Sequence, residues 1–78
     1  MNADKELKAS GMARVNLTPN IKQAISSMHG NEVLLVYNDD TASREGVPAW
    51  CRLTGHSLIE SKEISGTETL FYIRKKIT

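Results

Sequence analysis

Residues 47–56, VPAWCRLTGH, decide the expected fold, because they contain both a helix and the signal that ends it. Proline fits the first turn of a helix, and glycine accepts the left-handed conformation that follows the last turn. We therefore expect a short helix that begins at Pro48 and ends before Gly55, with a strand after it. Four residues share one face of this helix at the i, i+3, i+4, i+7 spacing: Val47, Trp50, Cys51 and Thr54.

The residues before this stretch predict a strand, a helix and a second strand. Residues 6–10 alternate between polar and apolar and end at Gly11, which is typical of a short strand. Thr18 and Pro19 have the residue types of a helix N-cap and first helical position. Residues 32–37, which are apolar after Glu32, are expected to be a central strand covered on both faces or nearly so. The apolar stripe of the first helix comprises Ile21, Ala24, Ile25 and Met28.

The second half of the chain predicts a helix and then a hairpin. Asp40 or Thr41 can cap the turn after the second strand, and Gly46 and Pro48 are expected to separate that turn from the main helix. Residues 57–64 and 69–73 read as strands joined by a tight turn at residues 65–67.

The predicted architecture is a two-layer α/β (α+β) sandwich with βαβαββ order. Two helices on one face of a four-stranded mixed sheet bury both apolar stripes. The first two strands are expected to be parallel and the last two antiparallel. We expect a single domain over residues 1–78, with residues 1–4 disordered.

Composition limits the classes of function. The 78 residues carry a net charge of +1, with 40% apolar and 24% charged residues, as in an ordinary soluble globular domain. This balance gives no general reason to expect binding to nucleic acid or to a membrane surface. A single cysteine excludes an internal disulfide. The chain has no run long enough to span a bilayer and no apolar signal sequence near its start, so the prediction is a cytoplasmic protein.

Residues 39–51, DDTASREGVPAWC, together with the Thr54-Gly55-His56 that follows, resemble the second-helix segment of the TusA/SirA-like sulfur-carrier family. The resemblance extends over roughly residues 7–74 and implies the same βαβαββ fold. Members of that family accept a persulfide sulfur on a cysteine and pass it to partner proteins. The resemblance therefore implies that the partners of this chain are other proteins, including those of a sulfur relay.

The family's functional motif is replaced in this sequence. Its nucleophile lies in a Cys-Pro-x-Pro motif three residues after a glycine, at a helix start, where the positive end of the helix lowers a thiol's pKa. Gly11 matches that glycine, which places Arg14 at the cysteine, Val15 at the first proline and Leu17 at the second. Arginine cannot act as the nucleophile or carry sulfur. The sequence therefore leaves open whether the chain is an enzyme.

The leading hypothesis is a family protein with a degenerate active site that serves as a protein-interaction or small-anion-binding module. Arg14, Asn16 and Thr18 are the residues that a partner would contact, because a guanidinium and free helix N–H groups would converge there. The alternative for Arg14 is a solvated loop arginine. No cofactor and no metal are expected.

Cys51 gives the second hypothesis, an active sulfurtransferase or persulfide carrier that uses this thiol. The competing interpretation places Cys51 in the core beside Trp50, because free cysteines are among the most buried residues. Burial within a helix also raises a thiol pKa.

The third hypothesis is an RNA-binding module, with Tyr72 or Phe71 facing outward and a basic tail at residues 74–76. The low net charge makes nucleic acid an unexpected partner. Two further features have simpler structural interpretations. Adjacent Asp39 and Asp40 are typical of caps, and His29 and His56 are expected near the C-terminal ends of helices.

Overall fold

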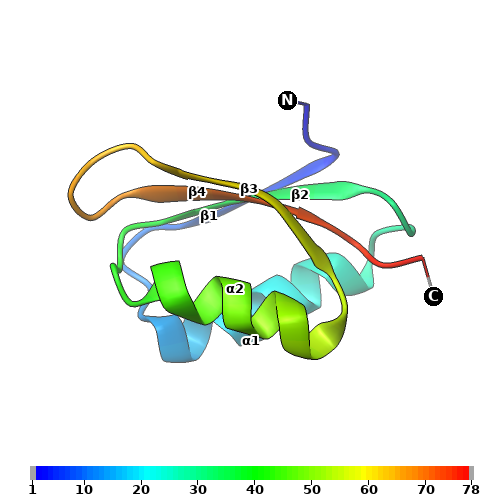
Figure 1. The fold of residues 1–78 in the computed structure, drawn as a ribbon, viewed down its shortest axis with the longest axis horizontal. Coiled ribbons are helices and arrows are strands. Elements are labelled where there is room, and N and C mark those ends of the chain that lie inside the picture. Colours follow the sequence, from blue (N-terminus) through cyan, green and yellow to red (C-terminus); the bar gives the residue numbers. More distant parts are fainter. Residues whose placement is uncertain (1, 78) are drawn as a thin grey trace.

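A computed structural model describes residues 2–77, apart from the side chain of Arg14, and confirms the βαβαββ order (Figure 1). The two helices lie together on one side of the sheet, and the other face is left uncovered. The predicted α+β sandwich with a four-stranded mixed sheet is therefore confirmed. The strands are Lys5–Ala9 (β1), Val33–Asn38 (β2), Ser57–Glu63 (β3) and Thr69–Arg74 (β4), and the helices are Arg14–Ser26 (α1) and Ser43–Thr54 (α2).

Strand pairing follows the sequence-based expectation and adds the order of the sheet, β1-β2-β4-β3. β1 is parallel to β2, as a strand pair joined through a helix should be. β4 is antiparallel to both of its neighbours, β2 and β3. The turn at residues 65–67 closes the β3–β4 hairpin, and the Ile64 N–H donates to the Glu68 carbonyl at 2.9 Å.

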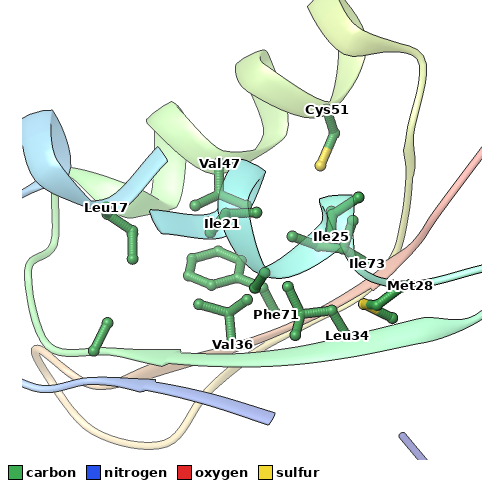
Figure 2. Close-up of a cluster of buried hydrophobic side chains, with 12 residues drawn as sticks. Leu17, Ile21, Ile25, Met28, Leu34, Val36, Val47, Cys51, Phe71 and Ile73 are labelled. Atoms are coloured by element: carbon green, nitrogen blue, oxygen red, sulfur yellow. The ribbon is translucent and has the colours of Figure 1, made fainter. Parts of the chain in front are cut away.

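The hydrophobic core fills the space between the helices and the sheet (Figure 2). Leu34 and Val36 of β2 point into it and are fully buried, whereas Leu35 and Tyr37 are only half-buried. The expectation that β2 is covered on both faces is therefore wrong, because both helices pack on the same side. The residues that make up the core are Ala9, Leu17, Ile21, Ala24, Ile25, Met28, Leu34, Val36, Val47, Cys51, Phe71 and Ile73.

α1 begins earlier than Thr18 and Pro19 suggest. Its N-cap is Ala13, and Pro19 lies inside the helix as its sixth residue. Proline in that place removes one helical hydrogen bond. The earlier start is favoured because it adds Leu17, which is fully buried, to the apolar stripe four residues before Ile21.

α2 also begins before its proline. Pro48 lies inside the continuous helix, so the expected break at Gly46 and Pro48 is wrong. The earlier turn buries Ser43, and Val47 is fully buried one turn later on the same face. The predicted end is confirmed, because Gly55 follows the last turn with φ 86°.

Near the start of the chain, Asp4 lies against β2. Its N–H donates to the Val33 carbonyl at 2.8 Å, and its Oδ2 accepts from the Val33 N–H at 2.7 Å. Disorder over residues 1–4 stays a prediction, and Met1 lies outside the described residues. Within residues 2–77, no helix has the length and apolar character needed to cross a membrane.

Candidate functional site

An open hollow of about 420 Å³ lies where the chain leaves β1 and β2 and enters the two helices. The carboxyl ends of parallel strands are where α/β proteins most often place their ligands. In the family register this is also where the missing motif would begin, because Gly11 lines the hollow three residues before Arg14. The other lining residues are Met12, Ala13, Asp39, Asp40, Thr41 and Thr67.

Asn38, the last residue of β2, holds the β1–α1 loop in place. Its side chain is fully buried. Its Nδ2 donates to the carbonyls of Ala9 and Met12, both at 2.9 Å, and its Oδ1 accepts from the Asp40 N–H at 3.0 Å. One amide side chain therefore fixes both loops that border the hollow. Sequence reasoning missed this role.

Asp39 and Asp40 accept hydrogen bonds from backbone N–H groups of the same two loops. Both carboxylate oxygens of Asp39 accept from the Gly11 N–H, at 2.9 and 3.1 Å. Asp40 Oδ1 accepts from the N–H of Ala42 at 3.0 Å, and Ala42 is the N-cap residue of α2. The expected cap of this turn at Asp40 is therefore present, and the two carboxylates point to different partners. Among residues 2–77, no group of three His, Cys, Asp or Glu side chains could hold a metal ion.

The start of α1 carries the residues proposed from sequence. Arg14 is the first residue of the helix, and Ala13 gives it no side-chain cap. The first turn contains no acidic residue, so the partial positive charge of the helix end is not offset within it. Positions 14 and 18 lie on one helix face, whereas Asn16, which is exposed, lies on another.

Thr18 contributes to a shallow groove between the two helices, which we call the helix groove. Its other lining residues, all from α2, are Gly46, Ala49, Trp50 and Leu53. Leu53 is 86% exposed, and Val15, one turn before Thr18 on α1, is 75% exposed. This apolar strip escaped sequence reasoning because Leu53 lies outside the buried stripe of α2.

Cys51 points from α2 into the core and is 2% exposed (Figure 2). Burial raises the pKa of its thiol to about 11, and the nearby Arg52 offsets this only in part. The reactive form of cysteine is the thiolate, which is therefore scarce here at neutral pH. This is the environment of a structural core cysteine.

Lys75 and Lys76 donate hydrogen bonds to backbone carbonyls at the C-terminal ends of both helices. Lys75 Nζ donates to the Met28 carbonyl just after α1, and Lys76 Nζ donates to the Thr54 carbonyl of α2 at 2.9 Å. The Lys76 N–H also donates to His56 Nδ1 at 3.0 Å. Burial, together with the two lysines, lowers the pKa of His56. The positive charge at the end of α2 therefore comes from Lys76 and from Arg52 in the last turn, whereas His56 serves as a hydrogen-bond acceptor.

The aromatic residues considered for RNA contact lie on opposite faces of β4. Phe71 is fully buried beneath the helices, so of the two aromatic residues named from the sequence it is not the one that faces outward. Tyr72 is half-buried and lies on the uncovered face, beside Leu35 of β2. His29 is 92% exposed, with its Nδ1 3.6 Å from Glu32 Oε1.

Comparison with known proteins relates the chain to sulfur carriers. The family described as "Sulfurtransferase TusA" matches residues 19–75. One relative, the Bacillus subtilis (strain 168) protein described as "Putative sulfur carrier protein YrkI", is 29% identical over 75 residues. That alignment covers 96% of this chain and 99% of the relative. The family match begins at Pro19, after the positions where the Cys-Pro-x-Pro motif would fall.

Proposed function

Because the chain belongs to the TusA sulfurtransferase family, we propose that it is a sulfur-relay protein with a degenerate active site that acts by binding other proteins. The observation that carries this proposal is that the nucleophilic cysteine of the family's motif is replaced in this sequence. In the register set by Gly11, Arg14 falls at the family's cysteine position, and a guanidinium cannot form a persulfide. The single thiol, Cys51, is buried.

The surface around the start of α1 supports a binding role. Arg14 stands at the uncapped, positive end of the helix, where an anionic group is favoured. Thr18, on the same helix face as position 14, leads into the helix groove, and Asn16 is exposed on a neighbouring face of the same first turns. A partner segment with an acidic residue followed by apolar side chains would match this order. We therefore assign recognition to Arg14, Asn16 and Thr18.

Apolar exposure along the same strip supports a protein partner over a free anion. Val15 and Leu53 are large aliphatic residues at 75% and 86% exposure. Covering such apolar side chains with a partner removes their surface from water, which favours association. A small anion would use the helix end alone and leave both side chains in water.

The two alternatives receive less support. A carrier that uses Cys51 needs an accessible thiol, and this thiol is 2% exposed with a pKa raised to about 11 by burial. An RNA-binding module needs a basic surface, and Lys75 and Lys76 are already engaged at the helix ends.

Loading with a persulfide donor tests the loss of the carrier reaction. We expect the intact mass of the native protein to stay unchanged, whereas an Arg14→Cys variant, which restores a thiol at the helix start, should gain the mass of a sulfur atom. Sulfur on native Cys51 would overturn the proposal.

Capture of sulfur-relay proteins from the source organism tests the binding surface. Arg14→Ala should weaken capture, and Lys22→Ala, an exposed cation later on α1, is the matched control. Equal capture by both variants would remove Arg14 from the site.

A further inference from the structure

The uncovered face of the sheet is built from two parallel rows of side chains. Residues directly opposite one another on paired strands lie on the same face. The first row crosses the sheet as Glu6, Leu35, Tyr72 and Glu60. The second row, two residues further along β2, crosses as Lys8, Tyr37, Leu70 and Lys62.

Burial and contacts confirm that these rows lie opposite the helices. The four charged residues are exposed, and the four apolar or aromatic ones are half-buried. Glu6, Lys8, Leu35, Tyr37 and Leu70 line a common hollow of about 360 Å³. On β3, the neighbouring Glu63 points the other way, with its Oε1 3.5 Å from Arg44 Nη1 of α2.

The centre of the uncovered face is apolar. The hydroxyl of Tyr37 already has a hydrogen-bond partner within the chain. The Tyr37 hydroxyl donates to the Glu68 carboxylate, which leaves its ring to pack with Leu35 and Leu70. A central apolar patch with a charged rim is the anatomy of a protein–protein interface.

The arrangement of charged residues on this face indicates which kind of molecule would bind it. One row ends in glutamate at both edges of the sheet, and the other ends in lysine at both edges. A second copy of the chain can be turned by 180° about an axis that lies in the plane of the interface, parallel to the two rows and midway between them. The row that ends in glutamate on each copy then faces the row that ends in lysine on the other. Glu6 then faces Lys8 of the second copy, and Glu60 faces Lys62. The same operation places Leu35 over Tyr37 and Tyr72 over Leu70.

We propose that the uncovered sheet face binds a second copy of this chain in a two-fold symmetric, face-to-face dimer. Symmetric dimers require a patch that is complementary to itself, and the paired rows meet this condition. Residues beyond the rows agree, because the operation also brings Arg74 over Glu68 of the second copy. Nucleic acid fits less well, because acids and bases alternate across this face.

Charge reversal tests the geometry. The double variant Lys8→Glu/Lys62→Glu makes all four rim positions acidic, and Glu6→Lys/Glu60→Lys makes all four basic. Each should weaken self-association by roughly 10-fold or more, because attraction becomes repulsion at four places. Mixing the two variants should restore association. The matched control is Lys22→Glu/Arg52→Glu, which removes the same positive charge from exposed positions on the helices.

Analytical ultracentrifugation in low salt should cover about 10 µM to about 1 mM chain, because a patch made of two rows of four side chains is small, and small interfaces are typically weak. We expect the native chain and the helix control to dimerise with the same affinity. A native chain that stays monomeric, rim variants that dimerise like the native chain, or a mixture that fails to associate would each overturn the proposal. So would binding of another protein to this face of a monomeric chain.

Discussion

Replacing Asn38 by alanine should destabilise the protein far more than the loss of one surface amide. Asn38 is fully buried and makes three hydrogen bonds, to Ala9, Met12 and Asp40. A buried group that loses its partner costs about 1–3 kcal/mol. The Ala9 carbonyl lies in the core, whereas the other two partners are half-buried and can recover part of their bonding from water.

These terms give an expected loss of about 3 kcal/mol in the free energy of unfolding. A domain of 78 residues has a total of about 4–12 kcal/mol, so the variant loses a quarter or more of its stability. Urea unfolding at 25 °C measures the change as a lower midpoint at a constant slope. Amide exchange should also accelerate in the β1–α1 loop, which Asn38 holds.

Two further variants separate the loss of hydrogen bonds at Asn38 from the loss of side-chain volume and from the loss of an amide elsewhere. Asn38→Leu fills the volume without restoring any hydrogen bond, so it should lose nearly as much as the alanine variant. Asn20→Ala removes an amide whose Nδ2 donates to the Asn16 carbonyl of its own helix, and it should change stability by less than about 0.5 kcal/mol. The reasoning fails if Asn38→Ala loses less than about 1 kcal/mol, or no more than Asn20→Ala.

Three other predictions follow from the packing. Gly30→Ala should cost about 1–3 kcal/mol, because the added Cβ would lie 2.8 Å from the Ile77 Cα, whereas Gly66→Ala, with open space around it, should be nearly neutral in thermal unfolding. Cys51 should react with an alkylating reagent at pH 8 at least about 100-fold more slowly in the native than in the unfolded protein, because burial raises its pKa from 9.0 to about 11; comparable rates would show that the thiol is exposed. Because burial lowers the pKa of His56 in the folded state, protonation favours unfolding, so stability should fall as the pH drops below about 6.5, and an NMR titration of His56 with a normal midpoint would contradict this.

The sequence predicted the fold well wherever an apolar run and a turn signal agreed. The run in β4 and the glycine that ends α2 correspond to their predicted places. The observed helices begin before the predicted starts, because burial of core residues outweighs the preference of proline for the first helical turn. Leu17 precedes Ile21 by four residues, so the apolar stripe of α1 already extended past Pro19. Burial of such a residue is what places the first turn.

The site was less predictable, because its contacts join residues distant in the chain. Asn38 bonds to Ala9 across 29 positions, and no local pattern signals that a strand-end asparagine will fix the loop after another strand. The helix groove arises only when α1 and α2 pack side by side. Arg14 could be identified as a departure from the family motif, but which apolar residues surround it depends on the packing.

The loop geometry around Gly11 does not by itself imply sulfur chemistry. Asn38 and Asp39 hold that loop through bonds to its backbone, and those bonds are equally available whatever side chain stands at position 14. The scaffold connects β1 to α1 and is needed for the fold itself. Sulfur transfer needs a thiol at the helix start, and the sequence has none there. The family's fold therefore does not by itself indicate the reaction, and Arg14→Cys is the substitution that tests the proposed loss of the carrier reaction.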